Sequence, residues 1–199
     1  MPIIVHEKTG TFHLTNDSIS YIFRIMENEQ LENLYYGKKI HDREDFSHLH
    51  EEEMRSQMSI CCPDPSLLSM QYTRQEYPSY GTGDYRSPAV TVLQENGSRI
   101  VNFTYDSYEV LAGKPGLAGL PATYAEDPSE AETLEIHLSD KLTGTELVLS
   151  YTVFADLPAI ARHARFRQTG SESVVENPWD GGAWWAAVYG VAQSRTRLK

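Results

Sequence analysis

Residues 134–153 read LEIHLSDKLTGTELVLSYTV, and this stretch decides the fold class. Apolar and polar residues alternate in 134–138, and leucine, β-branched and aromatic side chains recur through 147–153. A repeat of two residues is the period of half-buried β-strands. Residues 140–144 separate the two runs and are mostly polar with one glycine, as in a hairpin loop. The stretch therefore predicts two antiparallel strands joined by a longer, Gly-containing loop.

The same period of two recurs on both sides of this hairpin. In residues 19–25 the odd-numbered positions are all apolar or aromatic. In residues 159–167 the even-numbered side chains Ile160, Arg162 and Phe166 fall on one face of an extended chain. Both segments are therefore predicted to be strands.

A further hairpin is expected around Asn96-Gly97. Residues 89–93 before it and residues 99–108 after it are rich in β-branched and aromatic residues. Asn-Gly between such runs favours a type I′ turn, because both central residues of that turn need a positive φ. The pattern predicts that these two segments pair with each other.

Many short strands and almost no amphipathic helix predict an all-β fold, an antiparallel sandwich. Two segments depart from the strand pattern. Residues 45–58 are polar and charged, which predicts a helical turn or a long loop. Residues 113–128 are rich in proline and glycine and are predicted to form a loop.

The composition excludes several classes of partner. The chain has 199 residues, of which 40% are hydrophobic, enough to bury a core. Its formal net charge of -11 at pH 7 opposes binding to phosphate backbones and to anionic membrane surfaces. No apolar stretch approaches the ~20 residues that span a bilayer. We therefore expect no nucleic-acid partner and no membrane partner.

The cysteines and the N-terminus indicate a cytoplasmic protein. Residues 1–8 lack the basic and apolar regions of a secretory signal. The two cysteines, Cys61 and Cys62, are sequence neighbours, and a disulfide between neighbours has strained geometry. We expect reduced thiols that serve in packing; a nearby cation could instead make one of them reactive.

Residues 79–88 concentrate glycine and polar side chains. A phosphate-binding glycine loop joins a strand to a helix, whereas the next expected element here is a strand. Two interpretations remain. The loop is shaped by a local pair between Asp84 and Arg86, or it supports a neighbouring domain.

Other groups of polar side chains give weaker signals. His48 and His50, followed by three glutamates at 51–53, have metal-ligand chemistry but lack the spacing of a zinc site, so a solvated loop is favoured. The 28 acidic residues do not single out a glycosidase pair, and no nucleophile elbow is present. We expect no metal and no cofactor. Four tyrosines could stack on sugar or pack against other strands: Tyr72, Tyr77, Tyr80 and Tyr85.

Four blocks of sequence carry a family resemblance. They are LENLYYGKKI with DFSHL close behind, EYPSYGTGDYRSPAV, LPATYAE, and LTGTELVLSYTVFADLPAIARHARFRQTGSE. In their order and spacing, residues 3–175 resemble the N-terminal domain of a bacterial α-galactosidase of glycoside hydrolase family 36.

The resemblance implies a galactose-mutarotase-like super-sandwich, truncated here, which the family continues with a (β/α)₈ barrel and a C-terminal β-domain. It implies retaining hydrolysis of terminal α-galactosides such as melibiose and raffinose, with a catalytic Asp pair in the barrel. This chain shows no alternation of strands and helices, so no catalytic residue is assigned to it.

Accessory roles follow from the same resemblance. The larger family members are tetramers in which an N-terminal loop approaches the sugar pocket of a neighbouring subunit. By position, the substrate-proximal residues here would be Tyr36, Asp42, Arg43, Asp45 and Phe46. The loop expected near the junction with the barrel contains Gly81, Gly83, Asp84 and Arg86.

The resemblance ends near Val175. Residues 176–199 read ENPWDGGAWWAAVYGVAQSRTRLK and contain all three tryptophans. They lack clean alternation and resemble the translation of a mammalian interspersed DNA repeat. We expect a sandwich domain over 1–175 and an unrelated, irregular or weakly helical tail over 176–199. Two alternatives stay open: a free-standing carbohydrate-binding or assembly module, and a chimeric gene model with no function of its own.

Overall fold

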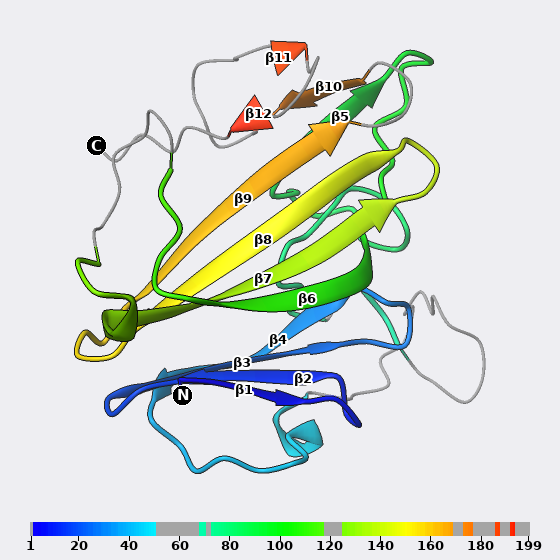
Figure 1. Cartoon of the computed structure of the whole chain (residues 1–199). Coiled ribbons are helices and arrows are strands. Elements are labelled where there is room, and N and C mark those ends of the chain that lie inside the picture. The colour runs from blue at the N-terminus through cyan, green and yellow to red at the C-terminus, as the bar shows by residue number, and fades with distance from the viewer. Residues whose placement is uncertain are drawn as a thin grey trace.

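The chain forms two antiparallel β-sheets that face each other (Figure 1). The first sheet has the order β1-β2-β3-β4, with β1 (Ile3–His6), β2 (Thr11–Thr15), β3 (Ile19–Ile25) and β4 (Leu31–Lys38). The second has the order β12-β9-β8-β7-β6, with β6 (Thr104–Ala112), β7 (Ala131–Asp140), β8 (Thr145–Phe154), β9 (Ile160–Gln168) and β12 (Ala192–Gln193). The all-β antiparallel sandwich is confirmed.

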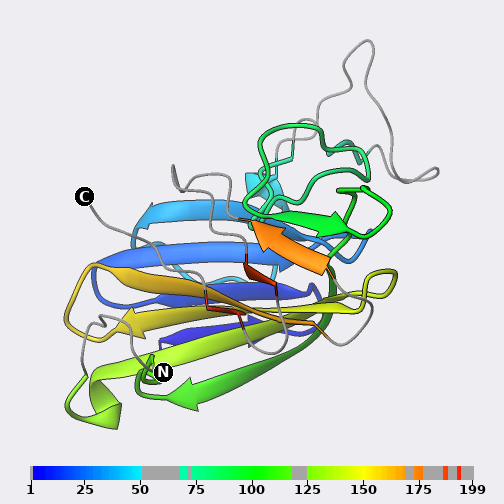
Figure 2. The same ribbon diagram turned by 90° about the horizontal axis from the view of Figure 1, so that it is seen from above.

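A small third sheet lies at one end of the sandwich (Figure 2). It has the order β11-β10-β5, with β5 (Thr91–Gln94), β10 (Ser173–Glu176) and β11 (Ala186–Ala187). Two short 3₁₀ helices, η1 (Ser47–Leu49) and η2 (Pro128–Glu130), lie in loops. This computed structural model describes residues 2–50, 68–70, 73–117 and 125–168 and the strand residues 173–176, 186–187 and 192–193.

The main core lies between the two large sheets. Phe12 and Phe23 of the first sheet stack with ring centroids 5.0 Å apart, and Tyr151 of the second sheet stacks on Phe23 at 5.0 Å. Leu134 and Leu147 of the second sheet are fully buried in the same cluster. Burial of such side chains contributes roughly 1.5–3 kcal/mol each, so this interface holds the sheets together.

The hairpin predicted over residues 134–153 is confirmed. Strand β7 pairs with β8 in a continuous register from Ala131↔Phe154 to Asp140↔Thr145. The loop closes through the Gly144 N–H, which donates to the Asp140 carbonyl at 2.9 Å, and Gly144 has a φ of +67°. Glycine adopts this conformation without a steric penalty, as the composition of the loop predicted.

The strands predicted at residues 19–25 and 159–167 are also confirmed, as β3 and β9. In β3 the predicted inner face is buried in the main core, and Ile22 on the opposite face is fully buried as well. In β9, Phe166 lies in the core and Arg162 shares its face. Both faces of the first sheet are therefore covered by protein.

The hairpin predicted at Asn96-Gly97 is wrong. Gly97 has a φ of +79° and its N–H donates to the Gln94 carbonyl at 2.9 Å, so a turn is present. Asn96 does not have the positive φ that a type I′ turn requires. After the turn the Val101 N–H bonds the Tyr80 carbonyl at 3.2 Å, and the chain leaves β5. Strand β5 pairs with β10 instead, and β6 pairs with β7.

The remaining segment predictions fall partly outside the described residues. Within residues 45–58 the structure shows the helical turn η1, and residues 51–58 lie outside the described part of the chain. Of the predicted loop 113–128, the parts 113–117 and 125–127 contain no strand or helix. The five described residues of 176–199 are in strands and not in helices. Outside the described part lie Glu51–Glu53, Cys61, Cys62, Tyr72 and the three tryptophans.

Candidate functional site

The loop of residues 39–50 covers the outer face of the first sheet (Figure 1). Its anchor is Phe46, whose side chain is buried with Ile22 and Leu34 in a second apolar cluster. The rings of His6 and His13 lie 6.3 Å and 5.4 Å from the Phe46 ring. The loop is thereby fixed to the strands β1, β2, β3 and β4.

A polar chain fixes the beginning of the same loop. The Ile40 N–H donates to Ser20 Oγ at 3.0 Å, and Ser20 Oγ lies 2.9 Å from His13 Nε2. His13 Nδ1 lies 2.7 Å from Asp42 Oδ1, which His6 Nε2 also contacts at 3.0 Å. We call Ser20, His13, Asp42 and His6 the histidine clasp. The tautomer of His13 that donates from Nδ1 to Asp42 and accepts at Nε2 from the Ser20 hydroxyl satisfies both contacts of its ring.

The order Ser20–His13–Asp42 is that of a nucleophilic triad. Both Ser20 and His13 are fully buried, and Ser20 Oγ already accepts the Ile40 N–H. A nucleophile must reach its substrate, so this clasp serves to position the loop. Burial raises the pKa of Asp42, but hydrogen bonds from His13 and then His6 outweigh it and hold that pKa below its usual value.

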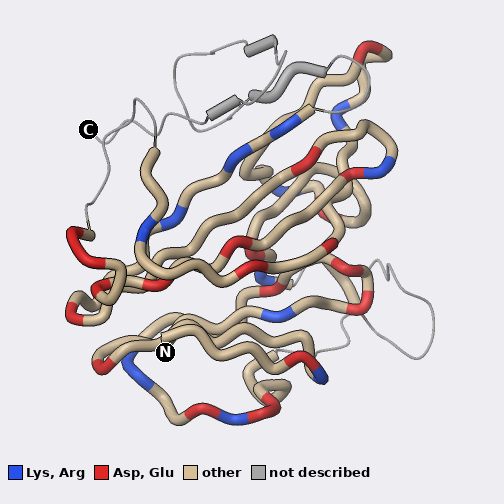
Figure 3. Tube along the Cα trace, in the orientation of Figure 1, with Lys and Arg blue, Asp and Glu red and all other residues tan. Residues whose placement is uncertain are grey.

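The five predicted substrate-proximal residues differ in exposure. Tyr36 exposes 58% of its surface, and Asp42, Arg43 and Asp45 are exposed, whereas Phe46 is buried. Figure 3 shows charges of both signs following one another along this loop. The Ser47 N–H donates to Asp45 at 2.7 Å and lowers the pKa of that carboxyl. The role of these residues near a substrate stays a prediction.

The predicted junction loop has an internal ion pair, as expected from Asp84 and Arg86. Arg86 Nε donates to Asp84 Oδ1 and Arg86 Nη2 donates to Asp84 Oδ2, both at 2.9 Å. Arg86 Nη2 also bonds the carbonyls of Met70 and Thr73, at 2.8 Å and 2.9 Å. Burial raises the pKa of Asp84, but the hydrogen bonds from Arg86 lower it more strongly.

Three consecutive residues of this loop have positive φ angles. They are Gly81 at +102°, Thr82 at +52° and Gly83 at +96°. The Gly81 N–H and the Asp84 N–H each donate to the other residue's carbonyl, at 2.9 Å and 3.0 Å. The glycines are required here because other residues rarely adopt this backbone conformation. The junction role of the loop stays a prediction.

A charged network that the sequence did not reveal crosses the core. Glu76 has a side chain only 1% exposed, and its Oε1 accepts from the Tyr21 hydroxyl at 2.5 Å and the Tyr151 hydroxyl at 3.0 Å. Arg162 Nη2 lies 2.5 Å from the same oxygen, and Asn33 Nδ2 donates to Oε2 at 3.1 Å. We call these five side chains the Glu76 network.

The Glu76 network joins both large sheets to the segment after Thr73. Burial, followed by the charge of Glu76, raises the pKa values of Tyr21 and Tyr151 well above the ordinary tyrosine value. The Arg162 guanidinium lies 5.0 Å from the Tyr151 ring centroid, within cation–π range. The tyrosines thus remain neutral hydrogen-bond donors to the carboxylate. The alternation in residues 159–167 placed Arg162 on the same face as Phe166, but no sequence pattern pointed to its partners.

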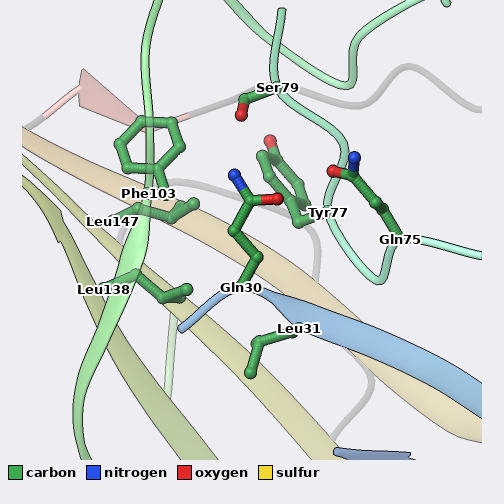
Figure 4. Close-up of a pocket in the computed structure, with 8 residues that line it drawn as sticks. All are labelled: Gln30, Leu31, Gln75, Tyr77, Ser79, Phe103, Leu138 and Leu147. Carbon is green, nitrogen blue, oxygen red and sulfur yellow. The ribbon is translucent and has the colours of Figure 1, made fainter. Parts of the chain in front are cut away.

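Among the described residues, a small cavity lies in the sandwich and an open hollow lies at its surface. One is a cavity of about 10 Å³ lined by Gln30, Leu31, Gln75, Tyr77, Ser79, Phe103, Leu138 and Leu147 (Figure 4). It has room for about one water molecule, so a sugar ring does not fit. The other is an open hollow of about 470 Å³ near Asn16, Lys39 and Glu132. Its described lining has no aromatic platform, which sugar-binding sites commonly use.

The remaining candidate side chains have structural partners. His50 Nδ1 lies 2.6 Å from Glu32 Oε1, and the His48 ring stacks near Phe46, so the two imidazoles have different neighbours. Among the described residues, no group of three His, Cys, Asp or Glu side chains is arranged to hold a metal. Tyr77 packs near Phe166, and its burial raises its pKa to about 12. Tyr80 and Tyr85 are exposed.

Comparison with known proteins decides the family. Residues 29–176 match the glycosyl hydrolase family 36 N-terminal domain. The chain belongs to this family. It is 38% identical over 174 residues to the α-galactosidase AgaA of Geobacillus stearothermophilus, covering 86% of this chain and 24% of AgaA. It is 33% identical over 178 residues to α-galactosidase 1 of Pediococcus pentosaceus, again covering 24% of that protein.

Solved structures of the family share the fold. The α-galactosidase of Lactobacillus brevis superposes with a TM-score of 0.82 at 37% identity, over 86% of this chain and 23% of that chain. The galactosidase domain of AgaSK superposes with a TM-score of 0.81 at 32% identity, over 88% and 24%. The chain thus spans about a quarter of the family 36 relatives that it matches. No described helix is long and apolar enough to cross a membrane.

Proposed function

We propose that this chain is an N-terminal, non-catalytic fragment of a family 36 α-galactosidase. The observation that carries the proposal is the match of residues 29–176 to that domain in proteins about four times as long. In the parent enzyme the chain supports retaining hydrolysis of terminal α-galactosides, such as melibiose and raffinose, by an Asp pair in the barrel. Solved structures of AgaA variants contain raffinose and stachyose, which supports this substrate class.

The partners of the domain are the barrel of the parent enzyme and further copies in a cytoplasmic tetramer. Tyr36 of β4 and Asp42, Arg43 and Asp45 of the 39–50 loop approach a neighbouring subunit's substrate, and the histidine clasp fixes that loop. Their exposure supports this role. Phe46 contributes by anchoring the loop, since its ring is buried. Gly81, Gly83, Asp84 and Arg86 shape the loop at the junction with the barrel.

Residues 176–199 form a tail unrelated to the domain, with the character of a translated mammalian repeat. The end of the family match at Glu176 supports this boundary. Sequencing DNA or RNA across the codons of Val175 and Glu176 tests it. Continuous reads from one bacterial genome through this junction would contradict a foreign tail.

An activity assay tests the non-catalytic role. The purified chain, incubated with an aryl α-galactoside, is expected to give no turnover above that of a mock purification. Turnover that follows the chain through purification would contradict the proposal.

A second function, a free-standing carbohydrate-binding module, is favoured by one observation. Tyr80 and Tyr85 are both exposed, with ring centroids 5.7 Å apart. Aromatic rings of this kind can stack on sugars. Calorimetric titration with galactose and with raffinose distinguishes the two functions. Binding at millimolar affinity or better, lost in Tyr85→Ser, supports the module, whereas no heat of binding supports the non-catalytic domain.

A further inference from the structure

The region that matches the family ends beside one particular loop. Strand β10 ends the matched region, and its Glu176 pairs with Thr91 of β5. The residues of 79–88 lead directly into β5, and the Ala89 N–H donates to the Pro78 carbonyl at 2.8 Å. Figure 2 shows β5 and β10 next to the irregular segment that precedes β5. In relatives about four times as long, the rest of the chain therefore starts next to this loop.

An exposed apolar patch is formed by two tyrosines of this loop together with Ile100, which follows β5. Tyr80 exposes 37% of its surface, Tyr85 67% and Ile100 48%. The two tyrosine rings meet edge to face at 83°. Ile100 packs against Gly81, because a Cβ added there would lie 2.7 Å from Ile100 Cγ2. We call Tyr80, Tyr85 and Ile100 the aromatic patch.

The backbone beneath the aromatic patch is held in a fixed shape. Gln30 Nε2 donates to Thr82 Oγ1 at 3.3 Å and to Asn102 Oδ1 at 2.6 Å. The buried Asp84 carboxylate holds Arg86 and accepts from Gln75 Nε2 at 2.9 Å. Thr82 has a positive φ, a conformation that costs free energy and persists only where surrounding contacts enforce it. A fixed loop that presents exposed tyrosines loses little entropy on binding.

We propose that the aromatic patch is the docking surface for the polypeptide that follows residue 176 in family 36 α-galactosidases. The proposal rests on the function proposed above. It assigns the contact to Tyr80, Tyr85 and Ile100, with the Asp84–Arg86 pair as the internal support. Tyrosine is enriched at the energetic centres of interfaces, because it buries a large area with few rotatable bonds.

A chimeric enzyme tests the proposal. Residues 1–176 of this chain replace the matched segment of AgaA, and the chimera is compared with the 199-residue chain by hydroxyl-radical footprinting. Tyr80 and Tyr85 are expected to be oxidised several-fold more slowly in the chimera. Leu157, 51% exposed in the loop between β8 and β9, is expected to react equally in both. Equal oxidation of Tyr80 and Tyr85 in the two proteins overturns the docking surface.

Substitutions give a second readout. Tyr85→Ser is expected to shorten the half-life of the chimera's α-galactosidase activity on heating by about tenfold, as for a central interface contact. The same change in the 199-residue chain should leave its melting temperature unaltered, and Leu157→Ser is the matched control in both proteins. An unchanged half-life overturns the docking surface. A chimera that is inactive without any substitution instead contradicts the proposed function, and the docking surface with it.

Discussion

Glu76 is a buried carboxylate whose charge is compensated by Arg162 and two tyrosine hydroxyls. The sequence allowed the local pair Asp84–Arg86 to be predicted, because the two residues are neighbours in one loop. It could not predict the Glu76–Arg162 pair, because the two are 86 positions apart and meet only when the sheets pack. Residue-scale prediction therefore succeeded for local partners and failed for long-range ones.

Glu76→Gln is expected to destabilise the chain by about 3 kcal/mol. The substitution removes the buried charge that accepts hydrogen bonds from Tyr21 and Tyr151 and pairs with Arg162, which is itself 41% exposed. Urea unfolding followed by fluorescence measures the change. Glu146→Gln is the control, since its 3.8 Å pair with Arg167 is half-exposed and is worth at most about 1 kcal/mol. Equal effects of the two substitutions would show that the Glu76 network does not stabilise the fold.

Asp42→Asn is expected to weaken the histidine clasp. It is also expected to make the free energy of unfolding fall less steeply as the pH is lowered. The pKa of Asp42 is lowered in the folded chain, so its contribution is present above the unfolded value and is lost as pH falls through the folded value. The window lies below a pH of about 4. Because Asp42 is about a third exposed, we expect a contribution of only about 1 kcal/mol. Unfolding measured at neutral pH and at successively lower pH gives the comparison.

The control for this prediction is Asp17→Asn. The Asp17 side chain is fully exposed and is paired with Lys39 at 3.1 Å, so it is expected to leave the acid profile unaltered. An Asp42→Asn chain that loses as much stability below pH 4 as the native chain would mean that other carboxylates govern acid unfolding.

At the scale of elements, the local sequence pattern agreed with the observed strand pairing in one hairpin and disagreed with it in another. The stretch 134–153 had strand periodicity and a loop whose glycine matches the observed φ, so the hairpin was predicted correctly, although its register was not predicted. The Asn96-Gly97 signal correctly marked a turn. Its partner strands were wrong, because β10, distant in sequence, occupies the edge of β5 and Tyr80 holds Val101. Turn chemistry alone does not fix which strands pair.

Gly81→Ala is expected to destabilise the junction loop by about 2 kcal/mol. The new Cβ would lie 2.7 Å from Ile100 Cγ2, and a φ of +102° is strained for alanine. Gly97→Ala separates the two causes, since Gly97 also has a positive φ but nothing within 4 Å of the added Cβ. We expect about 1 kcal/mol there. Thermal unfolding that shows equal shifts for both would mean that Ile100 moves aside without cost.

At the scale of the molecule, strand periodicity predicted the fold class, whereas the family blocks predicted the super-sandwich. Periodicity identifies half-buried strands but leaves their order open, because many sheet orders bury the same faces. The super-sandwich came from the family blocks, one of which, EYPSYGTGDYRSPAV, spans residues 76–90. Glu76 begins that block and bonds to Tyr21 of the first sheet and Tyr151 of the second. The segment therefore fixes how the two sheets are placed against each other.

The boundary at Glu176 leads to the last prediction, made for the whole molecule. The main core, the second apolar cluster and the Glu76 network all lie between Ile3 and Phe166. A chain shortened to residues 1–176 is therefore expected to unfold cooperatively, with a midpoint within about 4 °C of the full chain, the shift that corresponds to roughly 1 kcal/mol at this size. Calorimetry of the two chains measures this. A larger fall would mean that the tail stabilises the sandwich through its contacts with β9 and β10, and an unrelated tail has no reason to do so.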